Sequence, residues 1–425
     1  MIQQQPLVPP DSPKEFAAFV GIDWADQKHA VCLLHGERQS DMELPHTPEA
    51  IAEWALSLRR QFGGVPVAVA VEQSRGALIH ALMQHDHLVL FPINPKQAAH
   101  YREALSVAGR KDDPFDAQLL ARFLREHHDR LRPWKPDDGC TRELGRMCEL
   151  RRNVVEARKH VVQQLTATLK LYFPQALKFA GDLQRPMALE LLRRWPCLKE
   201  LQRANPTSLR KFFRQYGHRN DDRINALIAE IRASQALTTD PAILRPNALF
   251  VQTLVKQIEQ LNPAIEQFEK QIAALFAQHE DAAIFRSLPG AGAALAPRLC
   301  VAMGTDRTRF ADASNVQAYS GIAPVTKRSG KSCHVNRRFA CPKFIRQTFH
   351  EFADHARKWS AWSKAYYQQL RSQGSKHHAA VRALAFKWIR IIFRLWKGHT
   401  CYDEAKYTSQ LIRRNSPLAK KLTLA

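Results

Sequence analysis

Long apolar runs are missing from this sequence: no stretch approaches the roughly 20 residues that a transmembrane helix needs. The first residues, Met-Ile-Gln-Gln-Gln-Pro, lack the basic and apolar regions of a signal peptide. The eight cysteines are scattered, and no pair has the two-residue gap of a zinc knuckle. A chain of this size does not need disulfides. We therefore expect a cytoplasmic protein without a membrane partner, whose cysteines are reduced thiols that mostly fill the core.

Acidic residues are scarce in the last part of the chain. Residues 321–425 carry a net charge of +18, whereas residues 129–320 carry +9 and residues 1–128 carry −4. A charge that only aids solubility would be spread more evenly, whereas a surface that binds a polyanion is concentrated. We therefore expect a nucleic-acid partner, bound with an affinity that falls as salt rises. A crowded basic surface with no ligand is the alternative.

The 425 residues, of which 45% are apolar, suffice for two or three domains with packed cores. The first part alternates strand and helix patterns, and its strands are continuously apolar, which indicates an α/β domain. We expect strands at 18–23, 30–34, 42–44, 67–71 and 87–91, and helices at 48–62 and 76–84.

After Trp134 the pattern becomes helical. Two long helical patterns, at 139–172 and 247–277, flank a smaller helical stretch at 184–236. This arrangement predicts an antiparallel helical pair with an inserted subdomain, used for packing or dimerisation. We expect a flexible leader at 1–15, an α/β domain at 16–130, the helical region at 135–280, a mostly helical C-terminal domain at 281–400 with Trp388 and Trp396 in its core, and a poorly ordered tail at 401–425.

Four acids lie where a strand ends or a helix begins. Asp23 ends the apolar run that starts at Phe19, and Glu72 ends another that starts at Val65. An acid at the tip of a buried strand is costly to desolvate unless it binds a cation or a donor. Asp113 and Asp116 precede a helical pattern. Because oxygen ligands suit Mg²⁺, the four acids predict a divalent metal site of the kind that cleaves phosphodiesters.

Each acid also has an ordinary explanation. Asp113 before Pro114 fits a helix N-cap, and Asp116 then lies in the first turn, where acids favour the helix dipole. For this pair alone, capping explains the residues as well as metal binding does. The order of strand-end Asp, strand-end Glu and two acids three apart on a helix is the layout of an RNase H-like nuclease core. Asp26 and Asp112 are the nearest competing acids.

A glycine-rich turn and a basic segment follow in the C-terminal part. The turn Ser287-Leu-Pro-Gly-Ala-Gly292 resembles a helix-hairpin-helix DNA contact, whose N–H groups face a phosphate, although such a turn is often only a connector. No acid lies between Gly321 and His350. We expect nucleic-acid contacts from Gly290, Gly292, Lys327, Arg328, Lys331, Arg337, Arg338, Lys343 and Arg346.

Together these segments resemble the DEDD transposases of the insertion sequence 110 family, including the group named for insertion sequence 1111 and the Piv-type invertases. The match runs from Phe19 to about Phe123 and from about Phe285 to about Lys397. After Glu72 the family more often has Ala-Thr-Gly than the Gln-Ser found here. The matching motifs are Val-Gly-Ile-Asp23-Trp-Ala, Val-Glu72-Gln-Ser, Pro92-Ile-Asn-Pro95, Lys111-Asp-Asp-Pro-Phe-Asp116-Ala, Leu288-Pro-Gly-Ala-Gly292, Ala318-Tyr-Ser-Gly-Ile-Ala-Pro324 and Arg328-Ser329-Gly330.

The resemblance implies a recombinase with a RuvC-like, RNase H-like N-terminal domain and a serine nucleophile. Asp23, Glu72, Asp113 and Asp116 would bind Mg²⁺, as two ions for which Mn²⁺ could substitute. The nucleophile would be Ser329, in the C-terminal transposase domain. Taken without the family, Ser329 reads as a turn residue, and Ser332 and Ser320 compete with it.

The resemblance also implies the partners. These would be donor and target double-stranded DNA on the bacterial nucleoid, a structured noncoding guide RNA, and further copies of the chain in a dimer or tetramer. The inserted helical stretch makes this chain longer than the shorter members. Two alternatives remain: a RuvC-like endonuclease that uses water and does not need Ser329, and a non-enzymatic nucleic-acid scaffold that needs none of the five residues.

Overall fold

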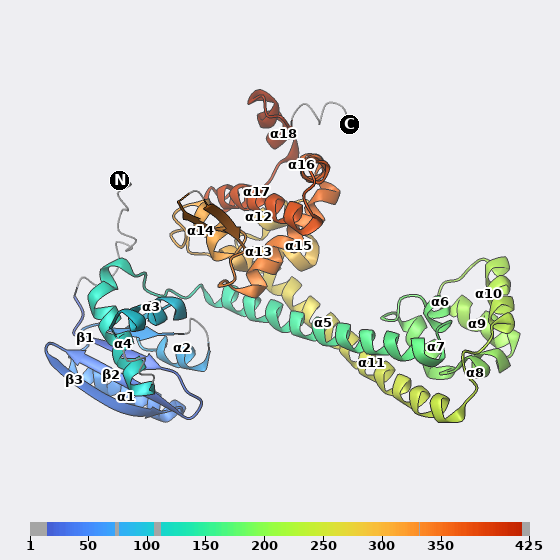
Figure 1. The fold of residues 1–425 in the computed structure, drawn as a ribbon, viewed down its shortest axis with the longest axis horizontal. Helices are drawn as coiled ribbons and strands as arrows, with labels where there is room; N and C mark the ends of the chain where they lie inside the picture. Colours follow the sequence, from blue (N-terminus) through green and yellow to red (C-terminus); the bar gives the residue numbers. More distant parts are fainter. Residues whose placement is uncertain (1–14, 73–75, 106–111, 331, 419–425) are drawn as a thin grey trace. The chain divides into compact units, whose positions relative to one another are not determined.

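The computed structural model describes residues 15–72, 76–105, 112–330 and 332–418 (Figure 1). Contacts divide the chain into two compact units, Met1–Pro136 and Asp137–Ala425. In these described ranges, no helix combines the length and the apolar character needed to cross a membrane.

The first unit is built on a mixed sheet (Figure 1). The sheet has five strands in the order β3-β2-β1-β4-β5. The central strand β1 pairs antiparallel with β2 and parallel with β4, and β4 pairs parallel with β5. Every residue of β4 is buried, as expected of a strand covered on both faces. The strands are β1 (Ala18–Asp23), β2 (Lys28–His35), β3 (Arg38–Pro45), β4 (Val67–Val71) and β5 (Leu88–Pro92).

Helices cover both faces of this sheet. On one face, Val69 of β4 belongs to a buried cluster with Trp54 of α1 and Leu82 of α2. On the other, Ala68 of β4 belongs to a cluster with Leu120 of α4 and residues of α3. The N-terminal part is therefore the mixed α/β domain that the sequence predicts, with the unpredicted helix α3 added. The helices are α1 (Pro48–Gln61), α2 (Ala77–Leu82), α3 (Pro95–Leu105), α4 (Asp113–His127) and the 3-10 turn η1 (His128–Arg130).

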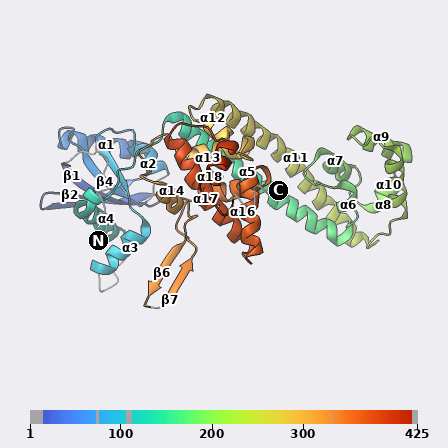
Figure 2. The ribbon, with the colours of Figure 1, turned by 90° about the horizontal axis from the view of Figure 1, so that it is seen from above.

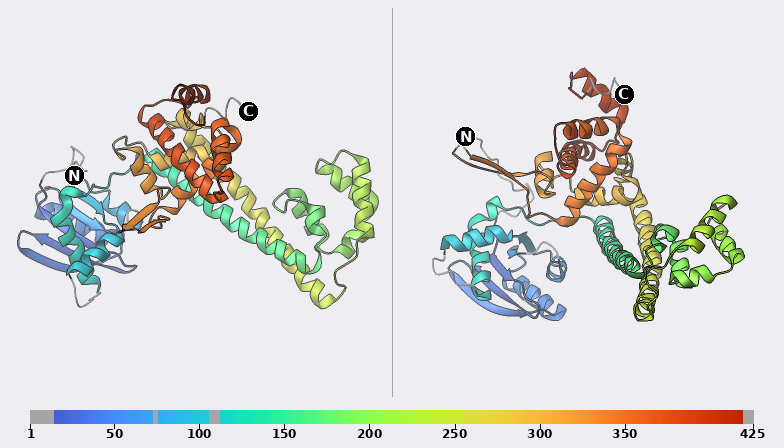
Figure 3. Two further views of the ribbon diagram at one scale, coloured as in Figure 1. Left: turned by 45° about the horizontal axis from the view of Figure 1, so that its top comes forward. Right: turned by 45° about the vertical axis from the view of Figure 1, so that its right-hand side comes forward.

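Two long helices, α5 (Gly139–Tyr172) and α11 (Pro241–Gln278), form an antiparallel pair in the second unit (Figure 3). Arg151 Nε donates to Glu269 Oε1 over 3.2 Å, and Arg158 Nη1 donates to Asn262 Oδ1 over 2.8 Å. Residue numbers rise along one helix as they fall along the other, so the predicted antiparallel pair is confirmed.

Helix α11 begins at Pro241 rather than at the predicted Asn247. The side chain of Asp240 accepts a hydrogen bond from Ala242 N–H over 2.8 Å, and Pro241 takes the first helical position. The N–H group at the first helical position has no partner within the helix, so a proline there costs no hydrogen bond. The cap and the proline therefore place the start of the helix before the predicted Asn247.

The inserted subdomain packs against one end of this pair. Short helices enclose a core that includes Leu169 of α5, Phe213 of the insert and Leu254 of α11. These helices are α6 (Ala176–Ala180), α7 (Pro186–Arg194), α8 (Leu198–Arg203), α9 (Pro206–Gln215) and α10 (Asp221–Ala233). Pro196 lies between α7 and α8, Pro206 begins α9, and Gly217 lies between α9 and α10.

The C-terminal helices form a second core with the other end of the pair. Trp362, Trp388 and Trp396 are fully buried, which confirms the core positions predicted for the last two. A two-stranded hairpin projects from these helices (Figure 2), and the sequence did not predict it. The elements are α12 (Ala282–Arg286), α13 (Gly292–Met303), α14 (Ala313–Tyr319), β6 (Val325–Ser329), β7 (Ser332–Asn336), α15 (Lys343–Trp359), α16 (Ala361–Ser372) and α17 (His377–Lys397).

The part of the predicted loose tail that the structure describes, residues 402–418, contains a helix, contrary to that prediction. Glu404–Arg413 form helix α18. Tyr402 anchors its start, because its hydroxyl accepts from Trp362 Nε1 over 2.8 Å and donates to Glu404 Oε2 over 2.6 Å. Leu418, beyond the helix, is buried.

The cysteines are all free thiols, as predicted, but most of them do not fill the core. Only Cys32, Cys148 and Cys300 are buried, whereas Cys333 and Cys401 are exposed. The core role predicted for most of them is therefore wrong.

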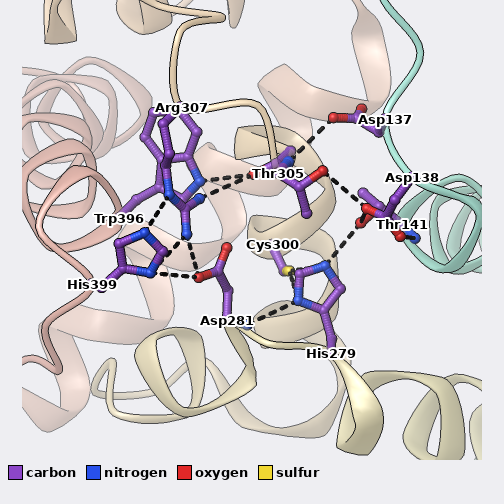
Figure 4. A network of polar contacts seen from close by, with 11 residues as sticks. Asp137, Asp138, Thr141, His279, Asp281, Cys300, Thr305, Arg307, Trp396 and His399 are labelled. Atoms are coloured by element: carbon purple, nitrogen blue, oxygen red, sulfur yellow. Dashed lines mark hydrogen bonds and ion pairs between the residues drawn. The ribbon is translucent and has the colours of Figure 1, made fainter.

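A buried polar network fixes the ends of several helices in the second unit (Figure 4). The fully buried carboxylate of Asp281, which follows α11, pairs with Arg307. The Arg307 guanidinium also lies 4.7 Å from the ring centre of Trp396 on α17. His279 Nδ1 accepts from the Asp281 backbone N–H over 3.1 Å, and its Nε2 lies 2.9 Å from Thr141 Oγ1 on α5. The network therefore joins α5, α11 and α17.

Candidate active site

Asp23 and Glu72 lie side by side at the carboxyl edge of the sheet. Ile22 of β1 is the register partner of Val71 of β4. Asp23 follows Ile22 and Glu72 follows Val71, so the two acids are neighbours across the two parallel strands. Asp23 is the last residue of β1, and Glu72 follows the end of β4. Both side chains are half-buried. The strand pairing thus brings together two acids that are far apart in the sequence.

Asp113 and Asp116 come from the first turn of α4. The helix is capped by Asp112, whose Oδ1 accepts from Phe115 N–H over 2.9 Å. The N-cap role that explained Asp113 is therefore wrong, because its neighbour fills it. Asp113 is exposed and Asp116 is buried. A spacing of three places the two carboxylates on one face of the helix.

A glycine allows α4 to reach the sheet. A Cβ atom on Gly21 of β1 would lie 2.1 Å from Ala117 O and 2.5 Å from Ala121 N. No side chain fits there, so the backbone of α4 lies directly against β1. Ala117 follows Asp116 in the helix, so this contact holds that acid near the end of β1.

The pKa of Asp23 depends on the other three acids. Burial, together with the negative charges of Glu72, Asp116 and Asp113, raises the pKa of Asp23 from 3.8 to about 6, and Arg102 opposes this rise. Like charges can raise a pKa in this way only when they lie close together. The other three acids selected from the sequence thus lie within electrostatic reach of Asp23.

Among the described residues, the cation Arg102 lies beside this cluster, and it was not predicted from the sequence. Arg102 Nη2 of α3 lies 2.6 Å from Asp116 Oδ1. The contact is an ion pair without a well-directed hydrogen bond, since within the described ranges neither Asp116 Oδ1 nor Arg102 Nε has a hydrogen-bond partner. A cavity of about 10 Å³ adjoins Glu72, Asp116 and Arg102. The sequence feature that could have indicated α3 is Asn94-Pro95 at its start. Asn94 Oδ1 accepts a hydrogen bond there from Lys96 N–H over 2.9 Å.

The donor set suits a hard divalent cation. All four candidate ligands are carboxylates, and oxygen ligands favour Mg²⁺ or Mn²⁺ over softer metals. Within the described ranges Asp116 Oδ1 lacks a hydrogen bond although Arg102 lies beside it, and burial together with the neighbouring acids raises the pKa of Asp23, so both carboxylates have capacity for a further cation. Among the described side chains, no three His, Cys, Asp or Glu residues are grouped closely enough to hold an ion as they stand. Asp26, the nearest competing acid in the sequence, is exposed beyond the end of β1.

Ser329 is exposed at the tip of the β6–β7 hairpin, in the second unit. Of its two competitors, Ser320 is fully buried and its hydroxyl donates to Gln317 O over 3.2 Å. Burial excludes Ser320 from attack on a DNA backbone. Ser332 is exposed like Ser329 and stays a competitor.

The basic residues predicted to contact nucleic acid surround this hairpin in the sequence, and they differ in exposure. Arg328, Arg337 and Lys343 are exposed, whereas Arg338 and Arg346 are half-buried. Lys331 and the side chain of Lys327 lie outside the described part of the chain.

Gly290 has a packing role in the turn between α12 and α13. Its φ is +75°, and a Cβ there would lie 2.8 Å from Trp359 Cδ1 and 3.1 Å from the backbone of His355. The glycine therefore allows α15 to pack against the turn. Gly292 is exposed and has open space around it. Phosphate contacts at these two glycines stay a prediction.

Comparison with protein families finds two matches. Residues 20–174 match a family described as transposase, and residues 282–368 match one described as "Transposase IS116/IS110/IS902 family". The first match contains the four acids, and the second contains Ser329.

Relatives that span most of the chain are also proteins of insertion elements. The mini-circle protein of IS117 from Streptomyces coelicolor, whose name describes a transposase, is 28% identical over 407 residues, which cover 93% of this chain and 97% of the relative. The 42 kDa protein of insertion element IS900 from Mycobacterium paratuberculosis is 25% identical and covers 92% of this chain and 98% of the relative. The 43.6 kDa protein of insertion element IS110 from Streptomyces coelicolor is 25% identical, with 92% and 96% covered.

Proposed function

Because the chain belongs to the insertion sequence 110 (IS110) family of transposases, we propose that it catalyses site-specific strand exchange of a mobile DNA element. The observation that carries this proposal is the convergence of four carboxylates at one edge of the sheet. Carboxylates so gathered need a compensating cation. Divalent metal ions would meet that need, and their remaining positive charge would bind the phosphate of a DNA backbone.

The N-terminal unit would act as an RNase H-like, RuvC-like domain. A mixed sheet with helices on both faces and acids at the ends of two adjacent parallel strands supports this assignment. The Gly21 contact supports it further, since it fixes the helix that carries the other two acids against the central strand.

Asp23, Glu72, Asp113 and Asp116 would hold Mg²⁺, as two ions that Mn²⁺ could replace. Once bound, such ions polarise phosphoryl oxygens and offset the charge that develops during cleavage. Around pH 7 the pKa of about 6 leaves most Asp23 carboxylates ionised and ready to bind a cation. Glu72 and Asp23 approach from adjacent strands and the other two from α4, so the scissile phosphate would be oriented from two sides.

Ser329 would supply the nucleophile. Its Oγ forms a bond to the phosphorus while the P–O bond to the leaving strand end breaks, which gives a transient phosphoserine link. The hydroxyl of a second DNA end then attacks that phosphorus and releases the serine. A serine is a weak nucleophile unless a base or a metal activates it. Arg328, the preceding residue of β6, would stabilise the charge on the phosphate, as would Lys327 and Lys331.

The partners beyond DNA follow from the family and from charge. The net charge of +18 in residues 321–425 supports binding of a polyanion, which would include a structured guide RNA as well as DNA. The active form would be a homo-oligomer, and the paired helices α5 and α11 offer a long surface for it.

The test is covalent trapping on DNA that carries the ends of the element. Wild-type protein with its guide RNA and Mg²⁺ should yield a protein–DNA adduct that survives denaturation. Asp116→Asn and Asp23→Asn should abolish the adduct and keep salt-dependent DNA binding. Asp26→Asn, an exposed acid beyond the end of β1, should behave as wild type. An adduct that forms equally well with Asp116→Asn would refute the carboxylate site.

A further inference from the structure

Arg102 is placed to control access to the carboxylate cluster. Its guanidinium Nη2 lies 2.6 Å from Asp116 Oδ1, and the Asp116 side chain is 10% exposed. A buried carboxylate beside other acids is costly unless a positive charge lies next to it. Arg102 supplies that charge, and it also lowers the pKa of Asp23.

The position of Arg102 is fixed by neighbours on its helix. The hydroxyl of Tyr101 donates to Glu126 Oε2 of α4 over 2.7 Å. Ala98, one turn earlier on α3, packs into a buried cluster with Leu120 of α4. The helix that carries Arg102 is therefore attached to the helix that carries Asp116.

The ion pair leaves polar atoms unsatisfied. Within the described ranges, Asp116 Oδ1 and Arg102 Nε have no hydrogen-bond partner. The adjacent cavity of about 10 Å³, next to Glu72, has room for about one water-sized sphere. The guanidinium offsets the charge of Asp116 but does not saturate its lone pairs, and a small cation with oxygen ligands would do both.

We propose that the Arg102–Asp116 ion pair and a divalent cation compete for the same carboxylate, so that Arg102 acts as an internal counter-ion that must leave Asp116 before the metal binds. The inference rests on the proposed metal site and adds its regulation. Its consequence is quantitative. If the pair is formed nine times out of ten, the apparent metal affinity is about tenfold weaker than that of the free site.

The test measures Mn²⁺ affinity by electron paramagnetic resonance of the free ion, using the full chain. Arg102→Gln removes the competing charge and should lower the dissociation constant about tenfold. Arg122→Gln is the matched control, because it removes the same charge from an exposed position of α4 and should leave the constant unchanged. Arg102→Lys, which keeps the charge, should lie near wild type.

A second readout separates this role from a purely structural one. In EDTA, Arg102→Gln should melt at a lower temperature than wild type, and saturating Mn²⁺ should raise its melting temperature more than it raises that of wild type. Equal or weaker Mn²⁺ binding by Arg102→Gln would overturn the competition. A different result would contradict the metal site itself: Mn²⁺ binding that the substitution Asp116→Asn does not weaken.

Discussion

Ser329 and Ser332 face each other as the last residue pair of the β6–β7 ladder. Both are exposed, and Gly330 between them has a φ of +54°. The two hydroxyls therefore share one solvent-facing tip, although their neighbours differ. This pairing turns the choice of nucleophile into a matched comparison.

Ser329→Ala should abolish the covalent adduct and reduce recombination by at least about 10³-fold, because a nucleophile has no substitute in a covalent mechanism. Ser332→Ala, at the opposite position of the ladder, should retain both. Recombination of a two-plasmid reporter and denaturing gels of the adduct measure the two effects. If Ser332→Ala loses the adduct and Ser329→Ala keeps it, the nucleophile is Ser332. Cleavage by Ser329→Ala at the wild-type rate would indicate a water nucleophile.

The raised pKa of Asp23 predicts a dependence of stability on pH. The group titrates near 3.8 when unfolded and near 6 when folded, so the folded state binds the proton more tightly. Its contribution to stability is therefore present below pH 3.8 and is lost as the pH rises through 6. In EDTA at pH 7.5, Asp23→Asn should melt above wild type, and the difference should shrink at pH 5. The control, Asp26→Asn, should melt with wild type at both values. A lower melting temperature for Asp23→Asn at pH 7.5 would contradict the convergence of charges.

The buried pair of Asp281 and Arg307 should dominate the stability of the second unit (Figure 4). Asp281→Asn leaves the Arg307 guanidinium without its charged partner, and loss of one member of a buried pair costs about 3 to 5 kcal/mol. Urea unfolding followed by tryptophan fluorescence measures this change. His399→Ala is the control: its side chain lies 3.7 Å from Asp281 but is 61% exposed, so the cost should stay below about 1 kcal/mol. Equal effects of the two substitutions would contradict the assignment.

Gly21→Ala should displace α4 and with it two of the four acids of the candidate site. The added methyl would overlap Ala117 O, so α4 must move, at a cost of about 1 to 3 kcal/mol or more. Because α4 carries Asp113 and Asp116, Mn²⁺ affinity should fall as well. Gly36→Ala in the β2–β3 turn is the comparison, since no atom lies within 4 Å of the added methyl. Its positive φ of +57° costs about 1 to 2 kcal/mol, without loss of Mn²⁺ affinity.

Continuous apolar runs allowed strands of the first unit to be predicted from the sequence. Strands β1 and β4 lie where they were predicted, because a run such as Val67–Val71 is buried on both faces and has no other stable placement. The long helix α5 also matches its prediction, since Asp138 and Phe173 mark its two ends. Helix α3 was missed because its described side chains bury little apolar surface, and Ala98 is the buried one among them.

The candidate site was only partly readable. The acids could be selected by their positions at strand ends, but the choice of cap between Asp112 and Asp113 depends on one hydrogen bond that the spacing does not fix. The Arg102–Asp116 pair depends on how α3 packs against α4, which no local pattern encodes. The β6–β7 hairpin is mostly exposed and polar, so it lacks the apolar alternation that identifies a strand.

The central claim is that four carboxylates from β1, β4 and α4 share divalent metal ions. Anomalous diffraction from crystals grown with Mn²⁺ and DNA tests it most directly. We expect manganese peaks within coordination distance of Asp23 and of at least one carboxylate of α4. The account would be contradicted by manganese bound elsewhere. It would also be contradicted if Asp23 and Asp116 were too far apart to bind the same two metal ions.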